Sequence, residues 1–183
     1  MSTTPHGTTT IEQYLSYEPP PHTTDELIEG KIILSPCPMP EHADLCTRLY
    51  DLLKPLLEDS QFMVRQDTSV RLPLSQSMPR PEVFVIDRER WRTARGSRTY
   101  PTGSPQLVIE VFSPSNQNEE FRKKPELYLA ADACAVWIVH PSDRSVEVRD
   151  HTGIRFLGGS ERLALPPPLP PGSFAVDQIF VVD

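Results

Sequence analysis

Apolar residues recur at helical spacing in the segment Glu41–Glu58, which is the longest helix that the sequence predicts. The apolar side chains of this segment fall three or four residues apart, as they do on one face of an α-helix. Pro55 lies inside the pattern and should kink the helix or end its regular part. A second helix is predicted over Asn118–Ala131, with an interruption at Pro125.

Short segments rich in Val, Ile, Phe and Trp lie around these helices, and this pattern predicts β-strands. Two of them, LVIEVF and AVWIV, are apolar on both alternating faces, which favours central strands covered on both sides. Glu26–Leu34 is expected to form two short strands that meet at Gly30, or one bent strand. The other predicted strands are Phe62–Gln66, Ser69–Leu72, Glu82–Ile86, Gln106–Phe112, Ala135–His140 and Ser145–Arg149, with Ile154–Leu157 and Ile179–Val182 as further edge strands.

Together these elements predict an α/β (mixed α+β) fold with a central mixed sheet flanked by helices. Residues 1–23 are interpreted as an N-terminal tail that contains a short helix over Ile11–Tyr17, capped by Thr10. Residues 24–183 are interpreted as a single domain, large enough to bury a core. The chain has 21 prolines, which predicts short elements, and Pro166–Pro171 should form a polyproline arm packed over the surface.

Charge and cysteine content limit the kinds of partner, metal site and compartment that this protein can have. The net charge of −7 means that the molecule as a whole does not attract a polyanion, so any nucleic-acid role needs a local basic surface. The three cysteines, at positions 37, 46 and 134, show no C-x-x-C spacing, which argues against a disulfide framework and a thiolate zinc site. With neither a secretory signal nor an apolar run near 18 residues, the sequence predicts a cytoplasmic protein.

Two glutamates carry most of the candidate chemistry. Glu110 shares its strand face with Val108 and Phe112, and a carboxylate on an apolar face is costly to bury without a partner. Glu82 opens another predicted strand, so the two carboxylates would converge if the strands are neighbours. Their repulsion would be relieved by a divalent cation, typically Mg²⁺. Structural alternatives remain open, namely a salt bridge or a strand end in water for Glu110 and a solvated strand start for Glu82.

A lysine is the third candidate. Lys123 and Lys124 are two of only four lysines, and they follow the Glu110 strand. A lysine beside two metal-binding carboxylates can neutralise charge that develops on a phosphate during hydrolysis. The alternative is an ordinary solvated helix face, because Glu119 and Glu120 stand four residues before these lysines.

The segment RERWRTARGSR follows the Glu82 strand and contains five arginines and Trp91. Arginine forks bind phosphate and Trp stacks on bases, so the segment is a candidate nucleic-acid contact that would flank the same site. The alternative is a basic loop that balances nearby acidic residues. The arginines are Arg88, Arg90, Arg92, Arg95 and Arg98.

Four sequence blocks together resemble a known family. They are ELIEGKIILSPCPMPEH, RPEVFVID, PQLVIEVFSPS and KKPELYLAADACAVWIVHP. Their order is similar to that of the Uma-type family of putative restriction endonucleases, which resembles the PD-(D/E)XK nuclease superfamily in fold. The likeness runs from about Thr24 to Arg149. It implies a restriction-endonuclease-like core.

The resemblance also implies roles for individual residues. The two acids of the family fall on Glu82 and Glu110, its lysine on Lys124 and its helix tyrosine on Tyr128. The first acid is Glu82 here, where the family usually has Asp. The early Glu and the helix-start His of the family fall on Glu26 and His42, which are auxiliary candidates. For His42, the residues alone favour a capping or surface role.

The function implied is a metal-dependent endonuclease that uses Mg²⁺ or Mn²⁺ to hydrolyse phosphodiester bonds in DNA. A homodimer is compatible with cutting two strands. One alternative is a nuclease-like scaffold that binds nucleic acid or a protein partner without cutting, because Glu82 replaces Asp and the net charge is negative. Another is an interaction domain that presents Pro166–Pro171 to an aromatic groove.

Overall fold

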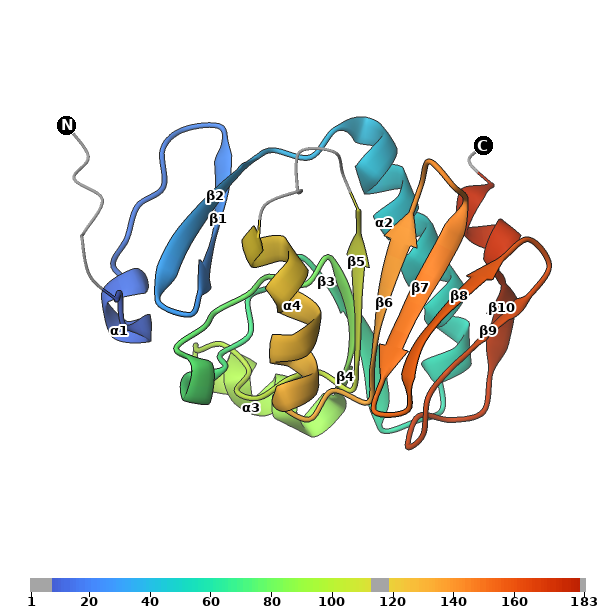
Figure 1. Ribbon diagram of the computed structural model, residues 1–183. Helices are drawn as coiled ribbons and strands as arrows, with labels where there is room; N and C mark the ends of the chain where they lie inside the picture. The colour runs from blue at the N-terminus through green and yellow to red at the C-terminus, as the bar shows by residue number, and fades with distance from the viewer. Residues whose placement is uncertain (1–7, 113–118, 182–183) are drawn as a thin grey trace.

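The computed structural model describes residues 8–112 and 119–181. Its centre is a six-stranded sheet in the order β3-β4-β5-β6-β7-β8 (Figure 1). The pair β5–β6 is parallel and the other neighbours are antiparallel, so the predicted mixed sheet is confirmed. The strands are β3 (Phe62–Gln66), β4 (Val83–Asp87), β5 (Leu107–Val111), β6 (Ala135–His140), β7 (Ser145–Asp150) and β8 (Gly153–Gly158).

Helices cover both faces of this sheet (Figure 1). On one face, α2 (Pro40–Leu53) buries a leucine stripe against the strands, and the C-terminal elements complete the same core. On the other face, α4 (Glu119–Ala130) packs through Tyr128. The strands β5 and β6 are the two central strands of the sheet, so the central positions predicted for LVIEVF and AVWIV are confirmed. The C-terminal elements are β9 (Arg162–Ala164), β10 (Ser173–Ala175) and the 3₁₀-helix η4 (Val176–Phe180).

Proline shapes the ends of several elements, as the sequence predicts. Regular α2 stops at Leu53, and Pro55 begins the 3₁₀-helix η1 (Pro55–Leu57). By contrast, Pro125 is accommodated inside α4. The arm Pro166–Pro171 packs against the core, with Leu169 only 6% exposed, so the arm is not a free peptide.

The N-terminal part forms a hairpin beside the main sheet. The expected pair of strands is observed as β1 (Thr23–Ile28) and β2 (Lys31–Pro36), joined by a turn in which Gly30 has a φ of +75°. The short helix α1 (Ile11–Tyr14) is capped by Thr10 and packs on this hairpin. The boundary between residues 23 and 24 stays a prediction.

Two predicted strands are wrong. Ser69–Leu72 forms only isolated bridges and leads into the 3₁₀-helix η2 (Pro73–Ser75). Its apolar side chains Val70 and Leu72 are buried by packing rather than by a strand ladder. Ile179 lies in η4, and Val182, the end of that predicted strand, is outside the described residues.

The arginine segment is a helix and not a loop. It forms α3 (Arg88–Gly96), because the Asp87 side chain accepts hydrogen bonds from the first free backbone N–H groups of the helix.

Among the residues that the structure describes, no helix is long and apolar enough to cross a membrane.

Candidate active site

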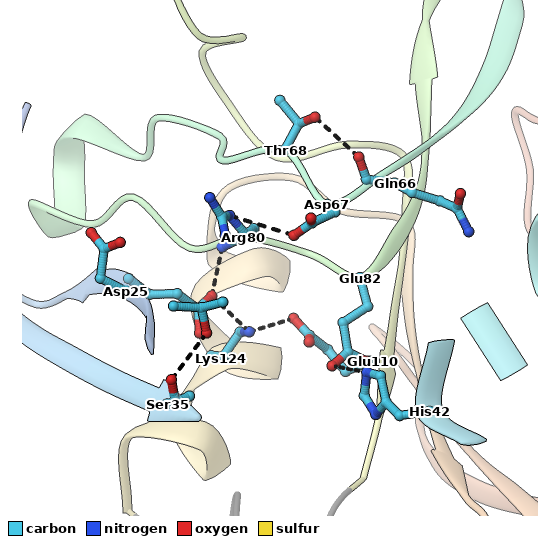
Figure 2. Close-up of polar contacts among 12 residues, drawn as sticks. Asp25, Ser35, His42, Gln66, Asp67, Thr68, Arg80, Glu82, Glu110 and Lys124 are labelled. Atoms are coloured by element: carbon cyan, nitrogen blue, oxygen red, sulfur yellow. Dashed lines mark hydrogen bonds and ion pairs between the residues drawn. The ribbon is translucent and has the colours of Figure 1, made fainter. Parts of the chain in front are cut away.

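A cleft of about 540 Å³ opens between the β1–β2 hairpin, α2 and α4, above one end of β4 and β5. The structure brings the three main candidates, Glu82, Glu110 and Lys124, together in this cleft (Figure 2). The auxiliary candidates Glu26 and His42 line it as well. Five residues from distant parts of the chain therefore share one solvent-accessible space.

Strand pairing explains how the two glutamates meet. In the antiparallel ladder of β4 and β5, Val83 is opposite Ile109. Glu82, one residue before β4, therefore lies across from Glu110, one residue further along β5. The backbone N–H of Val111 donates a hydrogen bond to Glu82 Oε2, which fixes this carboxylate at the end of the sheet.

Lys124 connects two acidic residues inside the cleft. Its Nζ lies 2.8 Å from Glu110 Oε1 and 2.9 Å from Glu26 Oε1, and its side chain is only 5% exposed. Burial lowers the pKa of Lys124, but the two carboxylates outweigh this and hold it above its usual value. The ammonium group is therefore protonated at neutral pH.

The two neighbouring lysines of α4 have different environments. Lys123 lies on a solvated helix face, which was the alternative prediction for both lysines. Its Nζ is 3.3 Å from Glu29 Oε2 and 3.2 Å from Glu119 Oε1. Lys124 points inward, one helical turn before Tyr128. The Tyr128 hydroxyl donates to Glu110 Oε1 at 3.0 Å, so Lys124 and Tyr128 converge on one carboxylate oxygen.

Glu110 is 1% exposed and occupies an unfavourable position for a negative charge. Burial raises its pKa to about 8, and the nearby carboxylates of Glu82 and Glu26 add to this, while Lys124 opposes it. Burial therefore disfavours the ionised form of Glu110, whereas the Lys124 ammonium favours it.

His42 belongs to this site and neither caps α2 nor lies free on the surface. It is in the first turn of α2, and its Nε2 is 2.8 Å from Glu82 Oε1 (Figure 2). The hydrogen bond to Glu82 raises the pKa of His42, against a smaller opposing effect of burial. The proximity to the cleft that the sequence suggested is observed.

Sequence reasoning missed two participants. Arg80 lines the cleft, donates its backbone N–H to Glu26 and places its Nε 3.5 Å from Asp67 (Figure 2). Cys46 lies one turn after His42 on α2, and its Sγ, His42 and Glu82 offer ligand atoms within 4.8 Å of one another. The spacing of four residues between His42 and Cys46 was the available signal.

The arginines of α3 do not flank this cleft, contrary to expectation. Glu82 precedes β4 and α3 follows it, so α3 is at the opposite end of the strand (Figure 1). Arg88 donates its Nε to the carbonyl of Ser60 at 2.8 Å, which ties α3 to the segment after α2. Arg90 is half-buried, and its Nη2 is 3.4 Å from Gln106 Oε1. Arg92, Arg95 and Arg98 are exposed.

Comparison with known proteins identifies the family of this chain. The family Uma2, described as "Putative restriction endonuclease", matches residues 11–176. The chain belongs to the Uma2 family. The Uma2 match extends beyond the four resembling blocks on both sides and includes α1 and part of the C-terminal elements. No curated protein matches the chain.

A solved structure shares the fold of this Uma2 protein. It is the crystal structure of a putative nuclease belonging to DUF820 from Anabaena variabilis. The two have a TM-score of 0.78 at 16% sequence identity, over 93% of this chain and 97% of that chain. At this identity the likeness establishes the fold, which is the predicted nuclease-like core.

Proposed function

We propose that this protein is a metal-dependent endonuclease that hydrolyses phosphodiester bonds in DNA. The observation that carries the proposal is the meeting of Glu82, Glu110 and Lys124 in one cleft, at the ends of two neighbouring strands. Membership of the Uma2 family supports a nuclease.

The carboxylates of Glu82 and Glu110 are suitable ligands for a divalent cation that prefers oxygen. Glu82 and Glu110 face the same cleft, and the pKa of Glu110 is raised mainly by burial and further by the carboxylates of Glu82 and Glu26. A divalent cation held by Glu82 and Glu110, with a backbone carbonyl such as that of Val111, would favour the ionised form of both. When bound, Mg²⁺ or Mn²⁺ polarises a phosphoryl oxygen and lowers the pKa of a bound water.

The protein's own groups would position the reactants. Lys124 is protonated, so it acts as a hydrogen-bond donor that orients water or neutralises charge on the phosphate, and not as a general base. Glu26 and Tyr128 are positioning residues, since Glu26 contacts the Lys124 ammonium and Tyr128 donates to Glu110.

Nicking of supercoiled plasmid in the presence of Mg²⁺ or Mn²⁺ tests this proposal. Glu110→Gln and Lys124→Gln should each reduce nicking by about 10²-fold or more. The first removes a proposed metal ligand, and the second removes the donor that orients water or neutralises charge on the phosphate. The matched controls are Glu147→Gln and Lys123→Gln. Glu147 is also a buried strand glutamate, and Lys123 is the neighbouring lysine, but neither lines the cleft.

Both controls should cut as the wild type does, once circular dichroism shows that all variants are folded. Equal nicking by the wild type and both cleft variants would remove Glu110 and Lys124 from the mechanism. Loss of nicking in the controls as well would mean that the substitutions act through the fold.

One observation favours a second function. Both oxygens of Glu82 already have partners within the chain, the Val111 N–H and His42. A protein in which these contacts persist would be a nuclease-like scaffold that binds nucleic acid or a protein partner without cutting. Calorimetric titration with Mn²⁺ separates the two functions, because a catalytic site should bind the ion and lose it in Glu82→Ala. DNA binding that needs no ion and gives no cleavage supports the scaffold.

We also propose that exposed arginines contact the DNA and that two copies of the chain form a homodimer. Arg92, Arg95 and Arg98 are placed to contact phosphates away from the cleft. A homodimer would present two sites to two strands. Light scattering of the purified protein with and without DNA measures this oligomeric state, and a monomer in both cases would contradict the dimer.

A further inference from the structure

A second set of potential metal ligands lies on the α2 side of the cleft. His42 and Cys46 are one turn apart on the same face of α2, and Glu82 faces them from the end of β4. Their ligand atoms lie within 4.8 Å of one another. All three side chains line the cleft and are partly accessible, so an ion can reach them from solvent.

The distances are compatible with one shared ion. In a tetrahedral zinc site, bonds of about 2.0 Å to nitrogen and about 2.3 Å to sulfur place adjacent ligand atoms about 3.3–3.8 Å apart. The 2.8 Å contact between His42 Nε2 and Glu82 Oε1 is a hydrogen-bond distance, so these atoms must separate by about 0.5 Å or more to admit an ion. The helix that carries His42 and Cys46 is itself fixed, because the Gln66 side-chain amide donates to the Cys46 carbonyl at 2.8 Å.

The donor types indicate which ion the site takes. Mg²⁺ binds almost only oxygen, whereas imidazole and thiolate prefer zinc-like ions. We infer that His42, Cys46 and Glu82 form a binding site for a divalent cation of the zinc type. Three protein ligands leave a fourth position for water from the cleft. Because the site combines nitrogen, sulfur and oxygen donors, it needs no C-x-x-C spacing in the sequence.

The inferred site has a regulatory consequence, which rests on the proposed function. Glu82 belongs to both the zinc-type site and the proposed Mg²⁺ site, so the two ions compete for it. Zn²⁺ binds nitrogen and sulfur donors far more tightly than Mg²⁺ does, so a small excess of Zn²⁺ should inhibit nicking in Mg²⁺.

Cobalt is a suitable probe, because Co²⁺ replaces Zn²⁺ and a cobalt–thiolate bond has an ultraviolet charge-transfer band. The reduced, chelator-treated full chain is titrated with Co²⁺, and then Zn²⁺ is added. The wild type should show the band at one Co²⁺ per chain, and Zn²⁺ should abolish it. Cys134→Ser is the matched control, since Cys134 is outside the cleft, and it should behave as the wild type does.

Cys46→Ser should lose the band. Absence of the band in the wild type, or its survival in Cys46→Ser, would overturn the inference. His42→Gln is a second variant, needed if Cys46→Ser does not fold. It should keep the thiolate band but weaken Co²⁺ binding by more than about tenfold, since losing even an outer partner of a ligand costs about that much. Unchanged affinity in His42→Gln would also overturn the inference.

Inhibition is measured as nicking with Zn²⁺ divided by the nicking of the same variant without it. The wild type should be inhibited and Cys46→Ser much less so. A cobalt band in a protein that does not nick DNA would support the metal site and contradict the proposed function. Nicking without a cobalt band would support the proposed function and contradict the metal site. The experiment therefore distinguishes failure of the metal site from failure of the proposed function.

Discussion

At the scale of single residues, the cleft is dominated by acidic groups held close to one another. Glu26, Glu82 and Glu110 all line it, and Lys124 compensates two of them. Burial and the neighbouring carboxylates raise the pKa of Glu110, and the carboxylates of Glu110 and Glu26 raise that of Lys124. The convergence of Glu82, Glu110 and Lys124 was predictable, because strand patterns and a family resemblance both pointed to these positions.

The His42–Glu82 contact gives the first prediction. Its hydrogen bond is the largest cause of the raised pKa of His42, so Glu82→Gln should lower that pKa toward the ordinary 6.5. The measurement is an NMR titration of the imidazole resonances. Glu89→Gln is the control, since Glu89 is exposed on α3 and outside the cleft. A His42 pKa that is the same in the wild type and Glu82→Gln would contradict the contact.

Glu110 gives a prediction about stability and pH. Its pKa rises from the ordinary 4.5 to about 8 on folding, so between these values the folded chain binds a proton that the unfolded chain has lost. The contribution of Glu110 is fully present below pH 4.5 and is lost as the pH rises through about 8. In Glu110→Gln this pH dependence is absent.

Urea unfolding at a series of pH values measures that effect in metal-free protein. The free energy of unfolding of Glu110→Gln should rise relative to the wild type between pH 4.5 and 8. Glu147→Gln provides a buried glutamate outside the cleft for comparison. A constant difference between Glu110→Gln and the wild type over this range would show that Glu110 is ionised throughout.

At the scale of elements, the site depends on how the hairpin, α2 and α4 dock on the sheet. Long, periodic elements such as α2 and the apolar strands β5 and β6 were predictable from local pattern. Strands as short as β9 and β10, three residues each, carry too little pattern to recognise. Cys46 fits the apolar face of α2, so the sequence pattern alone does not distinguish it from a core residue.

The turn of the β1–β2 hairpin gives a prediction at this scale. Gly30 has a φ of +75°, and an added Cβ would come within 2.1 Å of Thr8 Cγ2. Gly30→Ala should therefore lower the free energy of unfolding by about 1–2 kcal/mol and displace the strand that carries Glu26.

Gly96→Ala is the matched control, because a Cβ at that helix end meets nothing within 4 Å. Its stability should equal that of the wild type or slightly exceed it. Urea unfolding compares the two variants. Equal stability of Gly30→Ala and Gly96→Ala would contradict the described packing of the hairpin turn.

At the scale of the whole molecule, the charges are separated in space. The carboxylate-rich cleft is at one end of β4, and the exposed arginines of α3 are at the other end (Figure 1). Local pattern placed these groups together, because they are neighbours in sequence. A strand of five residues was enough to carry them apart, and only the tertiary structure reveals this.

The salt dependence of DNA binding tests whether the distant arginines take part. Each phosphate contact contributes about 0.9 to the slope of log affinity against log salt, so Arg92→Ala/Arg95→Ala should reduce that slope by about 1.8. Fluorescence anisotropy with duplex DNA in Ca²⁺ measures this slope. Arg155→Ala/Arg162→Ala is the control, because it removes two charges of the same sign from exposed positions outside α3 and the cleft. An unchanged slope in Arg92→Ala/Arg95→Ala would remove α3 from the binding surface.

The residues of the cleft are contributed by segments that lie far apart in the sequence. The groups around the cleft come from a hairpin, the start of one helix, two strand ends and the middle of another helix. Fragments of the chain that lack any of these pieces do not assemble the constellation, whatever local structure they adopt. In a chain emerging from the ribosome, the proposed active site is therefore incomplete until α4 has docked on the sheet. This late assembly follows from the topology alone.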